Sequence, residues 1–418
     1  MNRPLFAFIL ALMFSADAVA DDWPQWRGPN RTGISKETGL FKEWPSGGPA
    51  LRWKVEDIGT GYSSPAIVKG CVYLQITRGK EEFAISLDEN SGTQIWSVPI
   101  GKVGENRGPQ YPGTRSTPTV DGDFIYCLAS DGELVCLDGA AGKVKWERHL
   151  KNDFGGQAGK WAYSESVLVD GDVLICTPGG SKATLVALNK TTGDVIWESA
   201  VPGGDNAEYA SIMVVDDDTV KQYVQFLRTG IVGVEAETGK FLWRYDRTAA
   251  GQAANILTPV VFANRVFSAG SRSGGGLVEL KANSDGVTAT EVYSDGALGA
   301  SIGGAVLVDG YLYGTSRNAM FCAEFATGKV MWEQRALGAA SICYADDRLY
   351  VRSHESGDVA LVEPSTESYR EKGRLKQPKR SSTRAWPHPV IANGGLYLRD
   401  QGVLLCYDTS GPQDSDND

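Results

Sequence analysis

The chain has 418 residues, of which 42% are hydrophobic and 22% are charged, so it is long enough to bury a sizeable core. Its 51 acidic and 41 basic residues give a net charge of −10, which argues against the basic face of a nucleic-acid-binding protein. The histidines, His149, His354 and His388, lie far apart in the sequence, so we expect no histidine-rich metal site and assign no metal ligands.

The first twenty residues have the pattern of a cleavable export signal. Arg3 supplies the positive charge, residues 5–14 form a short apolar run, and Ala18-Val19-Ala20 matches the small-residue cleavage pattern. This run is too short to span a bilayer, and no later apolar stretch is long enough, so we expect no transmembrane segment. We therefore expect cleavage after Ala20 and a periplasmic or secreted protein.

The mature protein would then keep its seven cysteines in an oxidising compartment, where disulfides are permitted. Most of them lie in apolar runs, where a cysteine behaves as a small buried hydrophobic residue. Cys127 and Cys136 are different because they flank a predicted turn at Asp131-Gly132. Counting outward from a two-residue turn places them opposite each other, so a disulfide between them is the alternative to two free thiols.

A short motif, (Thr/Ser)-Gly-x-x-x-Trp or a close variant, recurs along the mature chain after an apolar run. Its glycine suits a left-handed turn and its tryptophan suits bulky apolar filler between neighbouring units, so we interpret the tryptophans as core residues. Tyr293 stands where the long interval before the last copy lacks a tryptophan. The repeated tryptophans are Trp53, Trp96, Trp146, Trp197, Trp243 and Trp332.

Each repeat contains three or four strand-like runs, and helical periodicity is absent. In the second repeat the runs span 117–120, 124–129, 133–138 and 144–148, with Asp-Gly turns after the first two. Four strands in every 40–50 residues or so, repeated many times, are typical of a β-propeller. The sequence thus predicts an all-β fold of four-stranded antiparallel blades.

The two ends of the chain decide the number of blades. Seven copies lie between residues 65 and 374, residues 389–408 offer three further strands, and residues 51–55 have the pattern of a fourth strand. Joining these end segments in one blade closes an eight-bladed, monomeric ring over residues 51–408 and removes exposed sheet edges. A seven-bladed ring would leave one copy unexplained. We expect residues 21–50 to pack on the propeller, with residues 23–29 on the outside of the ring, and residues 409–418 to form an acidic disordered tail.

The repeats, with Leu-Asp-x-x-x-Gly-Lys-x-x-Trp in particular, resemble those of the pyrroloquinoline quinone (PQQ) repeat propellers over nearly the whole mature chain. The likeness is greatest to secreted bacterial PQQ-binding-like propeller proteins, and stretches such as 23–29, 176–180 and 397–401 are similar to that group. The resemblance implies the propeller fold within the quinoprotein alcohol dehydrogenase-like superfamily. It leaves the function open, because outer-membrane assembly scaffolds and quinoprotein dehydrogenases share this architecture.

The dehydrogenase alternative implies residues that this sequence does not supply. The resemblance to those enzymes implies an adjacent-cysteine disulfide, a calcium site built from Glu, Asn and Asp, and a catalytic aspartate. This sequence has no Cys-Cys pair and no matching set of calcium ligands. PQQ with calcium is therefore not supported as a cofactor, and the catalytic residues are unassigned. The sequence favours a scaffold that binds a protein or glycan partner over a PQQ-dependent enzyme that oxidises an alcohol or sugar at the channel.

Propellers bind ligands on the loops that join the last strand of one blade to the first strand of the next. Aligning these loops brings five residues into one column and places three others beside it. We predict a ligand site at the channel mouth, in which aromatic rings stack a planar or carbohydrate ligand and the arginine holds its anion. The alternative is that these side chains only plug the entrance. The eight candidates are Tyr62, Arg115, Tyr163, Glu165, Tyr209, Asn255, Trp386 and His388.

Two long, glycine-rich loops, 101–116 and 151–164, are further candidates because long loops over a rigid ring often carry function. Their aromatic and basic residues could form a lid over the mouth. These are Arg107, Tyr111, Lys160 and Trp161.

Overall fold

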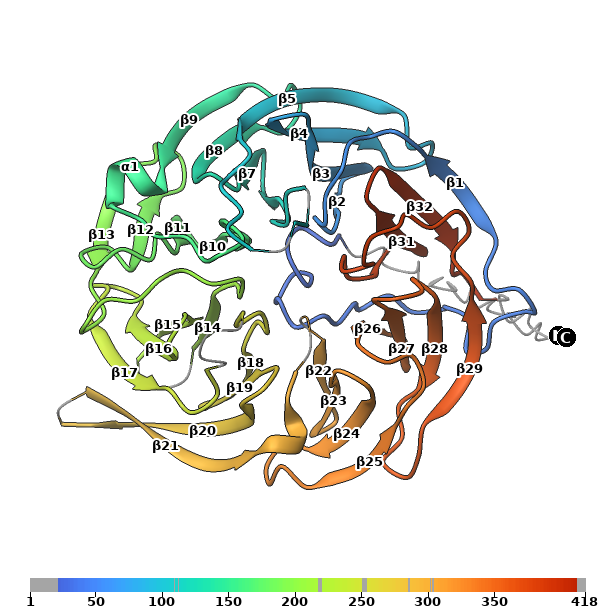
Figure 1. The fold of residues 1–418 in the computed structure, drawn as a ribbon. Helices are drawn as coiled ribbons and strands as arrows, with labels where there is room; N and C mark the ends of the chain where they lie inside the picture. The colour runs from blue at the N-terminus through green and yellow to red at the C-terminus, as the bar shows by residue number, and fades with distance from the viewer. Residues whose placement is uncertain are drawn as a thin grey trace, which may run out of the picture.

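The computed structural model describes residues 22–411 except 109, 112, 217–219, 250–253, 285, 301 and 303. The predicted export signal and residues 412–418 of the predicted tail lie outside the described residues. Eight four-stranded antiparallel sheets form a closed ring (Figure 1). The prediction of an all-β, eight-bladed propeller is confirmed.

Consecutive strands build the first seven blades, and each blade is a meander in which neighbours along the chain are also neighbours in the sheet. The strands of blades one to four are β2 (Ala66–Val68), β3 (Cys71–Arg78), β4 (Glu81–Asp88), β5 (Gln94–Lys102); β6 (Thr119–Asp121), β7 (Phe124–Leu128), β8 (Glu133–Asp138), β9 (Val144–His149); β10 (Leu168–Asp170), β11 (Val173–Cys176), β12 (Leu185–Asn189), β13 (Val195–Ser199); β14 (Met213–Val215), β15 (Gln222–Phe226), β16 (Ile231–Glu235) and β17 (Phe241–Tyr245). Those of blades five to seven are β18 (Val260–Phe262), β19 (Arg265–Gly270), β20 (Gly274–Asn283), β21 (Gly286–Asp295); β22 (Ala305–Val308), β23 (Tyr311–Thr315), β24 (Met320–Glu324), β25 (Val330–Gln334); β26 (Ala340–Ala345), β27 (Arg348–Ser353), β28 (Val359–Glu363) and β29 (Arg370–Leu375).

The eighth blade is shared by the two ends of the chain. Strands β30 (Val390–Ala392), β31 (Gly395–Asp400) and β32 (Val403–Asp408) are completed by β1 (Leu51–Val55), which pairs antiparallel with β32. The first strand of the ring is therefore held by hydrogen bonds to the last, as the sequence predicts. Each outer edge then lies on the rim of the disc.

Tryptophans on the fourth strands lock neighbouring blades together. The Trp53 ring lies against Gly92 of the next blade, where a Cβ would stand 2.9 Å from the ring, and its indole N–H donates to the Glu89 carbonyl at 2.8 Å. Gly92 has a positive φ of 71°, so glycine is required both for the turn and for the contact. The same pairing of ring, turn glycine and carbonyl repeats at Trp96, Trp146, Trp197 and Tyr293.

The boundary between blades four and five is among those that depart from this pattern. Trp243 donates to Gln222 of its own blade at 2.7 Å instead of to the following turn. The next blade carries the two longest strands, β20 and β21, and the sequence that joins them lacks the repeat glycine. The boundary is therefore closed by other contacts, including the Tyr245 hydroxyl on Glu291 at 2.7 Å.

The N-terminal segment, residues 22–36, runs inside the ring, so the prediction that residues 23–29 pack on the outside is wrong (Figure 1). Trp23 exchanges backbone hydrogen bonds with Ile67 of blade one, and the Arg31 guanidinium donates to the Val167 carbonyl of blade three at 3.0 Å. These donors satisfy carbonyls at the inner strands that would otherwise be buried without partners. Further hydrogen bonds from the segment reach blades five, six and seven at Thr258, Ala305 and Tyr344.

The predicted disulfide between Cys127 and Cys136 is not formed, because the hairpin has a three-residue loop. Ala129 pairs with Glu133, which leaves residues 130–132 in the turn. One extra loop residue shifts the register by one and places the two side chains on opposite faces of the sheet. Cys127 accordingly lies opposite Val135, and Cys136 lies opposite Tyr126. All seven cysteines are free thiols.

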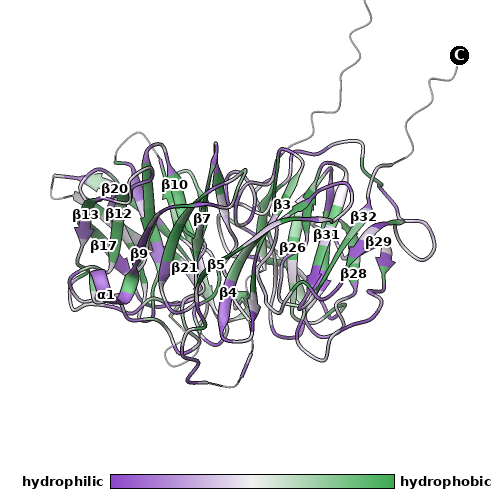
Figure 2. Cartoon of the chain, turned by 90° about the horizontal axis from the view of Figure 1, so that it is seen from above, coloured by the Kyte–Doolittle hydropathy of each residue, from purple (hydrophilic) through white to green (hydrophobic). Residues whose placement is uncertain are grey.

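Two short helical turns interrupt the β structure, α1 (Leu150–Phe154) and the 3-10 turn Gly296–Leu298. Neither was expected from the sequence. Over the described range of the chain, no helix is both long and apolar enough to cross a membrane. Seen from its edge, the disc has hydrophobic strands between two faces of mostly hydrophilic loops (Figure 2).

The contact at the ring closure can be tested with Trp53→Ala. Removing this buried tryptophan would leave an unfilled space at the contact between β1 and the next blade. The free energy of unfolding should therefore fall by about 3–5 kcal/mol. Leu51→Ala on the same strand is the matched control, since that side chain is 46% exposed and its loss should change stability by no more than about 0.5 kcal/mol. Urea unfolding measures both, and equal shifts in the two variants would contradict the role of Trp53.

Candidate functional site

A cavity of about 290 Å³ opens at one mouth of the central channel, and aromatic side chains form most of its wall. Five of the six aromatic side chains come from five different loops of the ring. Trp26 belongs to the N-terminal segment inside the channel, and the others lie on loops between consecutive blades. The aromatic lining residues are Trp26, Tyr62, Tyr111, Trp161, Tyr209 and Trp386.

The rings contact one another in pairs around the cavity. Trp386 has its ring centre 4.8 Å from that of Tyr62 and 4.7 Å from that of Tyr111. Across the mouth, the Tyr209 hydroxyl accepts a hydrogen bond from the Trp161 backbone N–H at 2.9 Å. Such tilted aromatic contacts stabilise each other and hold the wall in a fixed shape.

Arg115 is the cation of the cavity. Its guanidinium donates to the carbonyls of Trp161 at 3.2 Å and Tyr111 at 2.8 Å, and it lies 5.8 Å from the centre of the Tyr62 ring. Burial lowers the pKa of Arg115, but an arginine remains charged at neutral pH. In the described part of the chain no carboxylate forms an ion pair with it, so its charge is available to an anionic group.

His388 completes the wall beside Trp26, with a ring separation of 4.6 Å. Burial, followed by the nearby Arg27 cation, holds the pKa of His388 well below its usual range. The imidazole is therefore neutral at physiological pH, and it contributes a polar edge without a charge.

The structure brings five of the predicted site residues to the cavity, namely Tyr62, Arg115, Tyr209, Trp386 and His388. Their role in binding a ligand stays a prediction. Tyr111 and Trp161, which the sequence indicates as lid residues, line the same cavity. Arg107 and Lys160 are not part of its wall, although the Arg107 backbone N–H bonds the Lys160 carbonyl and joins the two long loops.

The other three predicted residues are absent from the cavity wall and join parts of the ring. Tyr163 is buried and donates its hydroxyl proton to the Pro178 carbonyl at 2.9 Å. Asn255 is buried and donates to the Leu227 carbonyl at 2.7 Å. The alignment of loops cannot show which way each side chain points.

Glu165 is fully buried beneath the mouth. Its carboxylate accepts hydrogen bonds from the Thr177 backbone N–H at 2.8 Å and the Thr177 hydroxyl at 3.0 Å. Burial raises the pKa of Glu165 to about 8, although these hydrogen bonds act in the opposite direction. The residue is thus a structural acid that connects the start of blade three to its second strand.

Trp26 is the aromatic cavity residue that sequence analysis missed. It stands outside the repeats and was placed with a segment expected on the outer surface. Its indole N–H donates to the Thr258 hydroxyl at 2.9 Å, which fixes the ring against blade five. The Trp-Pro-Gln-Trp-Arg stretch at 23–27 was a visible signal, because two tryptophans in an irregular segment need burial.

The cavity does not fit a quinone held with calcium. Calcium takes six to eight oxygen ligands, largely from carboxylates and carbonyls, yet the cavity wall has no aspartate or glutamate among its described residues. Its described residues also include no cysteine and only one arginine for a cofactor that carries several carboxylates. We therefore derive no chemistry through such a cofactor.

These features define the class of protein as a PQQ-repeat β-propeller. The sequence family described as "Outer membrane protein assembly factor BamB" matches residues 80–334, and the chain belongs to this family. A relative of that name from Shewanella oneidensis is 26% identical over 302 residues, which cover 68% of this chain and 67% of the relative.

Solved structures agree on the fold. BamB from Moraxella catarrhalis superposes with a TM-score of 0.60 at 16% identity, over 86% of this chain and 99% of that one. The quinohemoprotein alcohol dehydrogenase from Comamonas testosteroni gives a TM-score of 0.63 at 13% identity, over 96% and 83% of the two chains. At these identities the likeness concerns architecture alone, so it does not choose between a scaffold and an enzyme.

The buried acid gives a pH prediction. Because the folded pKa of Glu165 lies near 8 and its ordinary value is 4.5, the folded state binds the proton more tightly. The free energy of unfolding should therefore fall as pH rises from about 5 to about 8. Glu165→Gln should flatten this fall, whereas Glu198→Gln, at an exposed position of blade three, should not. Urea unfolding at several pH values measures the slope, and an unchanged slope in Glu165→Gln would count against the raised pKa.

Proposed function

We propose that this propeller is a binding scaffold in the assembly of exported proteins, and that the aromatic cavity at the channel mouth is its working surface. Membership of the BamB family supports a role in assembly. The cavity supports a role in binding, because its rigid aromatic wall surrounds the Arg115 guanidinium, which forms no ion pair within the described structure. Tryptophan, tyrosine and arginine are the residues that contribute most to protein-protein binding energy.

The ligand that matches this wall is a polypeptide segment with a large apolar or aromatic side chain next to a carboxylate. The rings would take the apolar group by stacking, and Arg115 would hold the anion. A glycan fits less well, since the polar side chains of the wall besides Arg115 and His388 are serines and tyrosines, and two of the serines already accept backbone hydrogen bonds. The partner is accordingly proposed as protein.

The proposed place of action is the periplasm or the exterior of the cell. The export pattern of residues 1–20 supports this location. The family name, which refers to the outer membrane, agrees with it. Seven free thiols of which six are buried are compatible with an oxidising compartment, because buried thiols react slowly.

The binding proposal is tested by panning a phage-displayed random peptide library on the purified protein. We expect enrichment of peptides in which Trp, Tyr or Phe neighbours Asp or Glu. Arg115→Met should weaken a selected peptide about 10- to 100-fold, the value of a lost charge-assisted hydrogen bond. Arg107→Met is the matched control, because it lies exposed on the same loop outside the cavity wall and should leave affinity unchanged.

Titration with PQQ, with and without calcium, tests the alternative on the same protein. We expect no saturable, calcium-dependent quenching of tryptophan fluorescence at concentrations up to about 0.1 mM, equivalent to binding weaker than about −5.5 kcal/mol. Saturable quenching that Trp386→Leu abolishes would refute the scaffold proposal. Enrichment of glycans on an array without any peptide selection would replace the proposed partner.

A further inference from the structure

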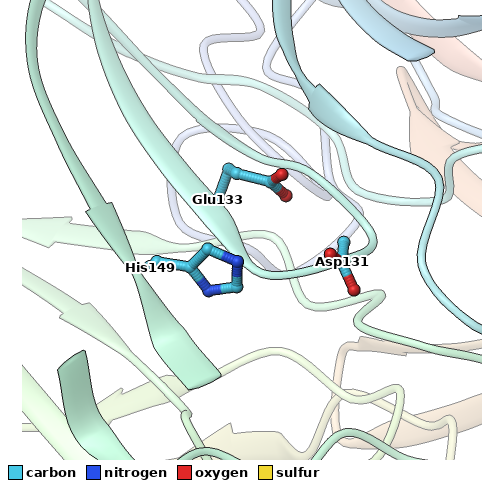
Figure 3. Close-up of side chains that lie close together, drawn as sticks. All are labelled: Asp131, Glu133 and His149. Atoms are coloured by element: carbon cyan, nitrogen blue, oxygen red, sulfur yellow. The ribbon is translucent and has the colours of Figure 1, made fainter. Parts of the chain in front are cut away.

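Three side chains that could bind a metal ion lie together on the hairpin of blade two. Asp131 is in the loop between β7 and β8, Glu133 begins β8, and His149 ends β9. One ligand atom from each lies within 4.8 Å of the other two. Figure 3 shows the His149 ring directed toward Asp131, with the Glu133 carboxylate above the space between them.

The fold fixes this arrangement through strand register. Glu133 and His149 are paired across β8 and β9, so their side chains project from the same face of the sheet. The three-residue turn that separates the cysteines also sets the place of Asp131, because Gly132 takes a positive φ of 118° between the two acids. Asp131 and Glu133 are close in the sequence, but His149 lies on the strand after them, and the spacing matches no familiar metal motif. The sequence pattern therefore does not reveal the cluster.

Two of the three side chains have a buried atom without a hydrogen-bond partner. These atoms are Oε2 of Glu133 and Nδ1 of His149. Leaving a buried polar atom unpaired costs about 1–3 kcal/mol, so two of them in one cluster need an explanation. No hydrogen bond joins the three side chains to each other within the described structure, and Oε1 of Glu133 accepts one from the Lys102 N–H at 3.1 Å. A cation bound between the three side chains would give the cluster a partner of opposite charge.

We propose that Asp131, Glu133 and His149 bind a divalent transition-metal ion of the zinc type. One imidazole and two carboxylates match the nitrogen and oxygen ligands that Zn²⁺ accepts, and three protein ligands leave a fourth position for water. Calcium and magnesium are disfavoured, since both prefer sites made entirely of oxygen. The separation of the ligand atoms, within 4.8 Å of one another, is small enough for one ion to reach all three with side-chain adjustment.

Lys151 is the competitor of the metal ion. Its ammonium pairs with Oδ1 of Asp131, and its side chain is 35% exposed, so it can turn away to solvent. Without metal the lysine partly neutralises the acidic pair. With metal its positive charge would oppose the ion, and removal of that charge should strengthen binding.

The metal site would stabilise the loops that carry the aromatic cavity. Ser130, one residue before Asp131, accepts a hydrogen bond from the Gly104 N–H through its hydroxyl at 2.8 Å, and its carbonyl accepts one from Tyr163 at 3.1 Å. Gly104 begins the loop that leads to Arg115, and Tyr163 ends the loop that contains Trp161. The site thus supports both long loops, and its existence does not depend on what the cavity binds.

Calorimetric titration of the metal-free protein with Zn²⁺ tests the proposal, and Co²⁺ absorption spectra report the ligand geometry. We expect one saturable Zn²⁺ site and no competition by excess Ca²⁺ or Mg²⁺. His149→Gln and Glu133→Gln should each weaken Zn²⁺ by more than about 10-fold, since even outer residues of metal sites matter by that factor. Lys151→Met should tighten binding.

The controls separate this site from adventitious binding by free thiols. Glu147→Gln, exposed on β9 two residues before His149, should bind Zn²⁺ as the unaltered protein does. Circular dichroism and urea unfolding without metal should show that the variants fold normally, and Asp131→Asn provides a further variant if one does not. Zn²⁺ binding that survives in both His149→Gln and Glu133→Gln would overturn the proposal. An unchanged affinity in Lys151→Met would remove Asp131 from the ligand set.

Discussion

The contact between a fourth-strand aromatic ring and a turn glycine of the next blade is the interaction on which the ring depends. Each blade has two faces of apolar side chains that it cannot bury by itself. The Trp53 ring against Gly92 shows how the chain solves this at the ring closure, with apolar burial and one indole hydrogen bond in the same contact. Because the contact sets the spacing of the blades, it also sets the diameter of the channel and the position of every loop at its mouth.

The N-terminal segment occupies the central channel of the ring and contributes to the wall of the cavity. Its arginines donate to carbonyls of the inner strands, and burial lowers the pKa of Arg27 and Arg31 to about 10, so both stay charged at neutral pH. Trp26 is fixed by the same segment and forms part of the cavity wall. A cavity of this shape therefore requires the filled channel as well as the loops, which links the proposed binding surface to the core of the fold.

The fold was predictable because its signals are periodic. Turn glycines and tryptophans recur along the chain, and the single strand at one end with the three strands at the other indicates the closure. The errors come from features with no period. One additional loop residue reverses the faces of Cys127 and Cys136, and a single irregular segment enters the channel instead of lying outside it. Loop alignment found Arg115 and Trp386 but could not separate them from Glu165, because side-chain direction depends on local backbone geometry.

The shared eighth blade has a consequence for how the protein is made. Strand β1 pairs only with β32, so a strand synthesised early must wait for one that emerges some 350 residues later. Pairings this distant in sequence form slowly, and until this one forms β1 and the last blade expose unpaired backbone. Over that interval the nascent chain is open to strand exchange and aggregation.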